Sequence, residues 1–277
     1  MKNPDVEEIL KGSFDLHVHA GPDPGRERRM DALDTARAAY ESEMKGFVLK
    51  SHDYPTASLA YALNRMYPGL EVAGSVVLNY GVGGLNPEAV RVAAALKAKV
   101  VWMPTFSAQF FLEKQGLGSG ISLWEEPGTL RPEVNDILDI VAANDMVLAS
   151  GHVSPEEAIA LFSLANEMRV SRMIATHPAG IATAEQLSEM VSLGVFVEYT
   201  FLACMPSRQD MSLAEFVDAV AAVGVEHCVV TTDFGQPENP PPAEGMRMAV
   251  AGLLTAGMSP DDVSRLVKDN PLQLVSG

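Results

Sequence analysis

Eight short apolar runs recur along the whole chain, and they constrain its fold more than any other feature. Each run is nearly continuous in apolar residues, which is typical of parallel strands that are covered on both faces. The pattern therefore predicts an α/β protein with eight parallel strands, over residues 14–19, 46–51, 72–78, 99–104, 146–151, 172–176, 195–199 and 228–232.

The segments between these runs carry helix signals. Ser154 is followed by Pro155 and, three residues on, by Glu157, which is a capping box with proline at the first helical position. Glycines follow two of the helical segments where a left-handed residue ends a helix well. The further capping pairs are Thr183 with Gln186, Ser212 with Glu215 and Ser259 with Asp262, and the closing glycines are Gly194 and Gly224.

Eight strands with intervening helices and no linker predict one (β/α)8 (TIM) barrel domain over residues 1–277. An open doubly wound sheet is the alternative, but no glycine-rich phosphate-binding turn follows the first strand. The longest connection, residues 105–131, follows the fourth strand. We therefore expect it to lie over the catalytic face of the barrel, because loops of this length in a compact fold are usually functional or mobile.

Charge and cysteine content limit the classes of partner. The chain has 20 basic and 36 acidic residues, a formal charge of −16, which disfavours nucleic acid and anionic membrane surfaces. We find neither a signal sequence nor a stretch apolar enough to span a bilayer. The two cysteines are too few for a disulfide framework. These features predict a cytoplasmic protein that acts on a small molecule.

Histidines gather at the carboxyl ends of the predicted strands, where the active sites of such barrels form. Side chains two positions apart in a strand share a face, so His17 and His19 lie side by side. Independent core histidines have no reason to share one rim, which indicates a metal site. The strand-end set is His17, His19, His152, His177 and Asp233, whereas His227 lies at the opposite end and is expected to be a core residue.

These five residues, the opening "DLHVH" and the closing "KDNPLQLVSG" resemble the amidohydrolase superfamily of metal-dependent hydrolases. The resemblance implies that His17, His19 and Asp233 are metal ligands and that Asp233 also accepts the proton of the attacking water. It implies that His152 is a ligand, and that His177 is either a second-ion ligand or a catalytic group that polarises the substrate. Zinc prefers such donors, and it lowers the pKa of bound water to about 7.

The fourth strand departs from the superfamily pattern. Binuclear members commonly carry a carboxylated lysine or an acid there, but this strand ends with Met103 and Thr105, which do not suit a bridge between two cations. Lys50, on the second strand, could be a carboxylated substitute or could pair with substrate charge, unless it turns to solvent. We therefore expect one tightly bound zinc ion, with a second ion only if Lys50 bridges.

Other residues of the predicted rim are candidates for substrate contact. His52 could bind metal, but contact with substrate is the preferred interpretation. The aromatic side chains of the long loop could form a lid or an oligomer contact. The remaining substrate-binding candidates are Arg26, Asn79, Tyr80 and Glu198.

The preferred function is metal-dependent hydrolysis of an amide, cyclic amide, lactone or related ester of a small molecule. A zinc-dependent decarboxylase of the same superfamily, which releases CO₂ from an unsaturated or aromatic acid, is an alternative. A metal-free lactonase on the same scaffold is another. A barrel that only binds a small molecule or metal is disfavoured, because none of the expected ligands has been lost.

Overall fold

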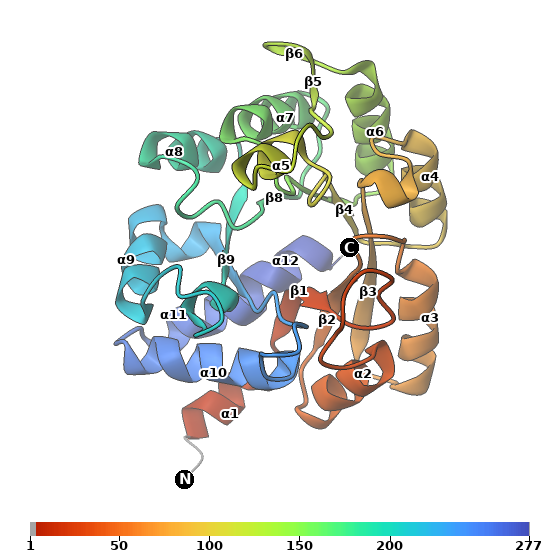
Figure 1. Cartoon of the computed structure of the whole chain (residues 1–277). Helices are drawn as coiled ribbons and strands as arrows, with labels where there is room; N and C mark the ends of the chain where they lie inside the picture. Colours follow the sequence, from red (N-terminus) through yellow and green to blue (C-terminus); the bar gives the residue numbers. More distant parts are fainter. Residues whose placement is uncertain (1–3, 277) are drawn as a thin grey trace. The chain divides into compact units, whose positions relative to one another are not determined.

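Eight parallel strands form the central sheet of the computed structural model, which describes residues 4–276. All eight predicted strands are confirmed, with ends within two residues of those expected. They follow one another in chain order in the sheet (Figure 1). They are β1 (Phe14–His19), β2 (Gly46–Lys50), β3 (Glu71–Val77), β4 (Val100–Trp102), β7 (Val147–Ala149), β8 (Met173–Ala175), β9 (Phe196–Thr200) and β10 (Cys228–Thr231).

The last strand returns to the first. Val18 in β1 forms a parallel bridge with Phe234, directly after β10, and the His19 amide donates to the Phe234 carbonyl at 2.8 Å. A parallel sheet in chain order whose last strand meets its first is the topology of a (β/α)8 barrel. The predicted fold class is therefore confirmed.

At least one helix separates each strand of this sheet from the next. The capping boxes at Ser154, Thr183 and Ser212 are all formed, and both predicted closing glycines have positive φ. Within the described part of the chain, no helix is long and apolar enough to cross a bilayer. The helices are α1 (Pro4–Leu10), α2 (Ala32–Glu41), α3 (Ala57–Met66), α4 (Pro87–Ala95), α5 (Gln109–Lys114), α6 (Pro132–Ala143), α7 (Pro155–Glu167), α8 (Ala184–Ser192), α9 (Leu213–Val223), α10 (Pro242–Thr255), α11 (Pro260–Ser264) and α12 (Asn270–Val275).

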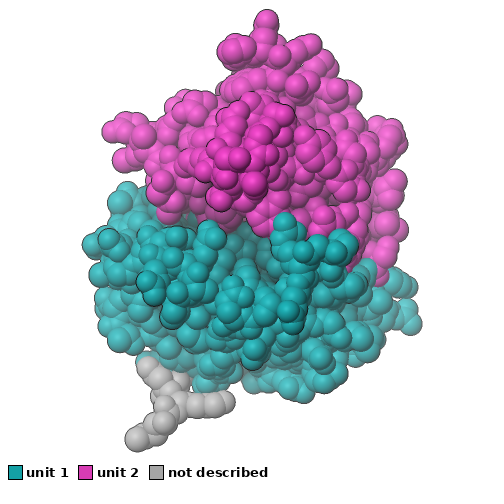
Figure 2. All heavy atoms as spheres, in the orientation of Figure 1, with its two compact units in different colours: residues 1–50, 59–73, 198–276 teal, residues 51–58, 74–197, 277 magenta. Residues whose placement is uncertain are grey.

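The chain divides into two compact units, coloured separately in Figure 2. Each unit is built from separate stretches of sequence. Unit 1 comprises the chain up to Lys50 together with Leu59–Ala73 and Glu198–Ser276, and unit 2 comprises Ser51–Ser58 and Gly74–Val197.

The long connection after β4 is more ordered than a plain loop. It contains α5 and a small antiparallel hairpin of β5 (Trp124–Glu126) and β6 (Thr129–Leu130). Glu157, a buried residue of α7, accepts hydrogen bonds from Ser122 Oγ at 2.6 Å and from the Leu123 amide at 2.7 Å. This carboxylate therefore fixes the connection to the helix that follows His152.

The asparagine of the "KDNP" motif holds the start of β10. Asn270 Nδ2 donates to the Val225 carbonyl at 2.8 Å and to the Cys228 carbonyl at 2.7 Å. Its side chain is buried, so these bonds are shielded from water. The motif thus positions the strand that leads to Asp233.

Candidate metal centre

Strand β1 places three polar side chains in the interior of unit 1. Asp15, His17 and His19 alternate with Leu16 and Val18, and all five are buried. Two neighbouring imidazoles and a carboxylate are costly to bury unless each has a polar partner. Their partners come from β2, β9 and the end of β10.

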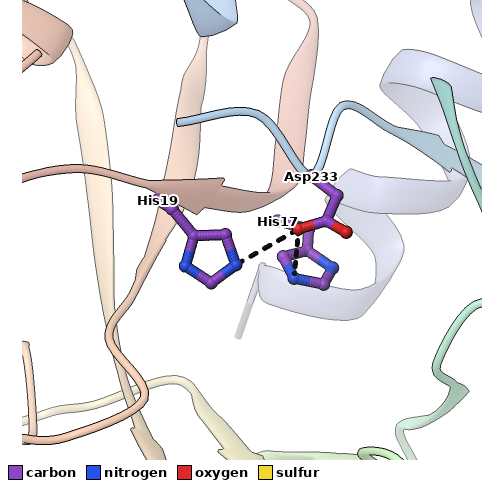
Figure 3. Close-up of side chains that lie close together, drawn as sticks. All are labelled: His17, His19 and Asp233. Carbon is purple, nitrogen blue, oxygen red and sulfur yellow. Dashed lines mark ion pairs between the residues drawn. The ribbon is translucent and has the colours of Figure 1, made fainter. Parts of the chain in front are cut away.

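Asp233 brings a carboxylate to the two imidazoles. It directly follows Thr232, its amide donates to the His17 carbonyl at 3.0 Å, and its φ of 55° is in the left-handed region. Asp233 Oδ1 lies 3.1 Å from His17 Nε2 and 3.2 Å from His19 Nε2 (Figure 3). The predicted convergence of these three side chains is therefore present.

The other ring nitrogen of each histidine is held by a hydrogen-bond acceptor. His17 Nδ1 lies 2.9 Å from Glu198 Oε1, and His19 Nδ1 lies 3.1 Å from the Lys50 carbonyl oxygen. Because both oxygens can only accept, each Nδ1 carries the proton in the neutral ring and each Nε2 offers its lone pair. Outer partners orient metal-binding histidines in proteins in the same way.

This arrangement fits a divalent cation. Burial lowers the pKa of His19 to about 3, against the opposing effect of Asp233, so the imidazole is neutral. Its Nε2 lone pair then faces a carboxylate oxygen at 3.2 Å, and two acceptors at this distance need a positive group between them. The ligand atoms of His17, His19 and Asp233 lie within 4.8 Å of one another. Neutral imidazoles and one carboxylate are a donor set that zinc prefers.

Lys50 lies inside unit 1, not at its surface. Its side chain is fully buried, and Nζ donates to His17 Nε2 at 3.0 Å. Burial lowers the pKa of this ammonium group to about 8, although Asp233 and Glu198 act in the opposite direction. Since His17 Nε2 has one lone pair, an ion bound there takes the place of the lysine contact. A bridging role for Lys50 stays a prediction.

A second network fixes the chain on which Asp233 lies. Asp15 Oδ2 accepts from Thr232 Oγ1 at 2.5 Å, and Oδ1 accepts from the Thr232 and His17 amides at 3.1 Å. Burial raises the pKa of Asp15 to about 7, against these hydrogen bonds. The carboxylate thus ties β1 to β10 beside the ligands. The "DLHVH" motif places Asp15 on the histidine face, but the sequence does not reveal Thr232 as its partner.

In unit 2, His52 and Asn79 hold the start of the long connection. Thr105 Oγ1 lies 2.8 Å from both His52 Nδ1 and Asn79 Nδ2, and Asn79 Oδ1 accepts from the Thr105 and Ser107 amides. All four side chains are buried. The Asn79 amide is therefore engaged in fixing the loop after β4, which is a different role from the predicted substrate contact.

His152 and His177 lie together in the same unit. Their ring centroids are 5.0 Å apart, and two phenylalanines of the long connection pack beside them. Phe111 lies 5.2 Å and Phe106 5.6 Å from the His152 ring, and Phe106 lies 4.0 Å from the His52 ring. The aromatic side chains of the long connection thus pack against the histidines, an arrangement that is compatible with the predicted lid. Ligation by His152 and His177 stays a prediction.

The remaining candidates divide by burial. Arg26 and Tyr80 are exposed, and the Arg26 amide donates to Asp23 Oδ1 at 2.9 Å. His227 is also exposed, so the prediction that it is a core residue is wrong. Glu198 is fully buried and accepts from Thr231 Oγ1 and from His17 Nδ1, both at 2.9 Å. Its position therefore favours orientation of a ligand over contact with substrate.

Comparison with known proteins gives a family and a fold. A family model described as "Family of unknown function (DUF6282)" matches residues 12–198. The chain belongs to this family. No curated protein matches the sequence.

Solved structures of similar fold cover almost the whole chain. An amidohydrolase from Pseudomonas aeruginosa aligns with a TM-score of 0.70 and 12% identity, over 98% of both chains. The probable dipeptidase PvdM from the same organism gives 0.69 and 14%, over 97% of this chain and 96% of its own. An organophosphorus hydrolase from Deinococcus radiodurans gives 0.61 and 12%, over 98% and 94%. The likeness to an amidohydrolase is thus confirmed at the level of the fold.

The Glu198→Gln variant is expected to bind zinc about 10- to 100-fold more weakly, because the loss of an outer partner of a metal-binding histidine has this effect. The amide can present its NH₂ group to His17 Nδ1 and so favour the wrong tautomer. Competition with a chromophoric chelator measures the affinity. Glu226→Gln, an exposed acid of the same unit, is the control. An unchanged zinc affinity in Glu198→Gln would show that this hydrogen bond does not orient a ligand.

Gly235→Ala is expected to disturb His19. A Cβ at this position would lie 2.2 Å from the His19 carbonyl oxygen and 2.6 Å from its Cβ, and φ is 146°. Gly257 also has positive φ, 97°, but no atom lies within 4 Å of its Cβ position, so Gly257→Ala is the matched control. Both variants lower Tm, and only Gly235→Ala weakens zinc binding. Equal zinc affinities in the two variants would contradict the close packing of this loop on the ligand.

Proposed function

We propose that this protein is a metal-dependent hydrolase that acts on a small molecule. The observation that carries the proposal is the convergence of two Nε2 atoms on one oxygen of Asp233, with both Nδ1 atoms held by acceptors. The Nε2 lone pair of His19 and this oxygen are both acceptors, so the pair favours a cation between them. We propose that one zinc ion occupies this site, held by His17, His19 and Asp233.

The residues of unit 1 divide the chemistry between them. When bound, the ion would act as a Lewis acid and would make water nucleophilic at neutral pH. Asp233 accepts the proton of the attacking water at its carboxylate and passes it to the leaving group. Glu198 holds the His17 tautomer, and Asp15 holds the chain at Thr232.

The substrate class that we propose is an amide, cyclic amide, lactone or related ester. The names of the similar structures, an amidohydrolase, a probable dipeptidase and an organophosphorus hydrolase, agree with hydrolysis on this fold.

Cys204 and Cys228 are free thiols, which agrees with the proposed cytoplasmic location.

A substrate panel tests the proposal. Zinc-loaded protein is incubated with lactones, amides, esters and unsaturated acids, while acid release and CO₂ are both recorded. We expect acid release that is lost with a chelator and restored by zinc. CO₂ release from an unsaturated acid would instead identify the decarboxylase alternative, and hydrolysis that survives the chelator would identify the metal-free lactonase.

A further inference from the structure

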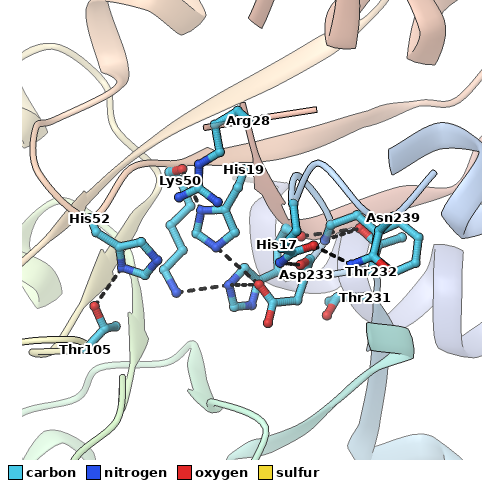
Figure 4. A network of polar contacts seen from close by, with 12 residues as sticks. His17, His19, Arg28, Lys50, His52, Thr105, Thr231, Thr232, Asp233 and Asn239 are labelled. Atoms are coloured by element: carbon cyan, nitrogen blue, oxygen red, sulfur yellow. Dashed lines mark hydrogen bonds and ion pairs between the residues drawn. The ribbon is translucent and has the colours of Figure 1, made fainter. Parts of the chain in front are cut away.

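Arg28 is a buried cation beside the candidate metal centre of unit 1. It lies in the connection between β1 and α2, and only 6% of its side chain is exposed. Figure 4 shows Arg28 close to Lys50, whose Nζ donates to His17 Nε2 at 3.0 Å. A guanidinium group buried near a second cation and near a site for a divalent ion is unfavourable unless an anion joins it.

Asp23 uses only part of the hydrogen-bonding capacity of Arg28. Asp23 Oδ2 accepts from Nε at 2.7 Å, and Nη2 lies 2.6 Å from the same oxygen. Asp23 Oδ1 is turned to the Gly25 and Arg26 amides, so the pair is not a two-oxygen fork. Nη2 is buried and shares Asp23 Oδ2 with Nε, and no further acceptor among residues 4–276 forms a hydrogen bond with it. A guanidinium group carries five N–H donors, and several therefore remain for a ligand.

Two backbone hydrogen bonds and one side-chain hydrogen bond hold the chain around Arg28. The Gly21 amide donates to the Met30 carbonyl at 2.9 Å, which closes the loop on itself. The Arg29 amide donates to the Gly235 carbonyl at 2.8 Å, and Arg29 Nη1 donates to the Pro237 carbonyl at 3.2 Å. Arg28 is thus fixed against the segment after β10 that also carries Asp233. Such preorganisation favours recognition of a ligand group in one orientation.

We propose that Arg28 binds a carboxylate group of the substrate, so that the hydrolase acts on small carboxylated molecules. The inference rests on the proposed function and adds the class of substrate. The planar guanidinium group matches a carboxylate with two parallel N–H···O bonds, which a lysine at this position would not supply. Asp23 holds the arginine, and the substrate carboxylate takes up its remaining donors.

Calorimetric titration of the zinc-loaded full chain with glutarate, succinate and benzoate tests this assignment. We expect Arg28→Met to weaken binding of these carboxylates at least about tenfold, since the variant loses hydrogen bonds between charged groups, which are stronger than those between neutral groups. Arg37→Met removes the same charge from an exposed position of α2 and leaves binding unchanged. Glutaramide, the neutral analogue of glutarate, binds the wild type no better than it binds Arg28→Met.

Two further variants separate recognition from folding. Arg28→Lys keeps a charge for Asp23 but loses the planar fork, and the double variant Asp23→Asn/Arg28→Met leaves no buried charge without its partner. Both fold, and both show the weaker carboxylate binding. A lower Tm with unchanged carboxylate affinity in these variants, or no carboxylate binding by the wild type, would overturn the assignment. If carboxylates bind in an Arg28-dependent way but no carboxylated ester is hydrolysed, the proposed hydrolase function is wrong and the proposed carboxylate site is retained.

Discussion

Replacing Asp233 with asparagine lowers kcat by about 10³-fold or more, because one substitution removes both functions of this carboxylate. A positioned proton acceptor contributes about 10²- to 10⁴-fold to a rate, and an amide cannot accept the proton. The amide is also a weaker ligand for zinc than a carboxylate. Turnover of the substrate identified from the panel, measured with zinc in excess, gives the size of the effect.

The fold of the Asp233→Asn variant is expected to survive. Asp233 has φ 55°, and asparagine is among the few residues that tolerate this left-handed conformation. The backbone amide of residue 233, which donates to the His17 carbonyl, is retained in the variant. Circular dichroism and Tm should therefore match the wild type. A rate within tenfold of the wild type would show that Asp233 is only structural.

The strands and the ligand triad could be predicted because they follow from simple periodicities. Apolar runs with helix caps between them predict parallel strands, and alternation along β1 places His17 and His19 on one face. Asp233 was assigned from its place after the last run, and the structure brings it to the same two histidines. The carboxyl ends of parallel strands meet at one rim, so position in sequence determines this part of the site.

Sequence periodicity does not predict loop conformation or the register of one strand against the next. The arginines after β1 are equivalent in sequence, yet Arg26 is exposed while Arg28 is buried on Asp23, since the turn at Asp23 decides which one points inward. Glu198 is predicted to face the site, and the register of β9 aims it at His17 Nδ1, whereas contact with substrate stays a prediction. Asn79 is predicted to contact substrate, which stays a prediction, and the sequence does not reveal that its Oδ1 accepts from the Thr105 and Ser107 amides.

The second result that we expect is one zinc ion per chain. Among residues 4–276, Lys50 is the one candidate bridge between two ions, and its Nζ donates to His17 Nε2. A bridging lysine must carry a carboxylate, and divalent ions held close together without such an anion repel each other. Lys50→Met keeps the length of the buried side chain and should still bind one ion. His19→Ala removes an Nε2 ligand and should bind zinc at least about 10²-fold more weakly.

Titration of the metal-free chain with zinc measures the number of ions bound per chain directly. Binding is followed by competition with a chromophoric chelator and by elemental analysis after gel filtration. We predict one tight equivalent in the wild type and in Lys50→Met, and none retained in His19→Ala or in the double variant His17→Ala/Asp233→Ala. Two tight equivalents in the wild type, one of them lost in Lys50→Met, would replace the single ion with a pair bridged from β2. Wild-type protein that retains no metal, or a His19→Ala variant that retains it fully, would contradict a metal centre at His17, His19 and Asp233.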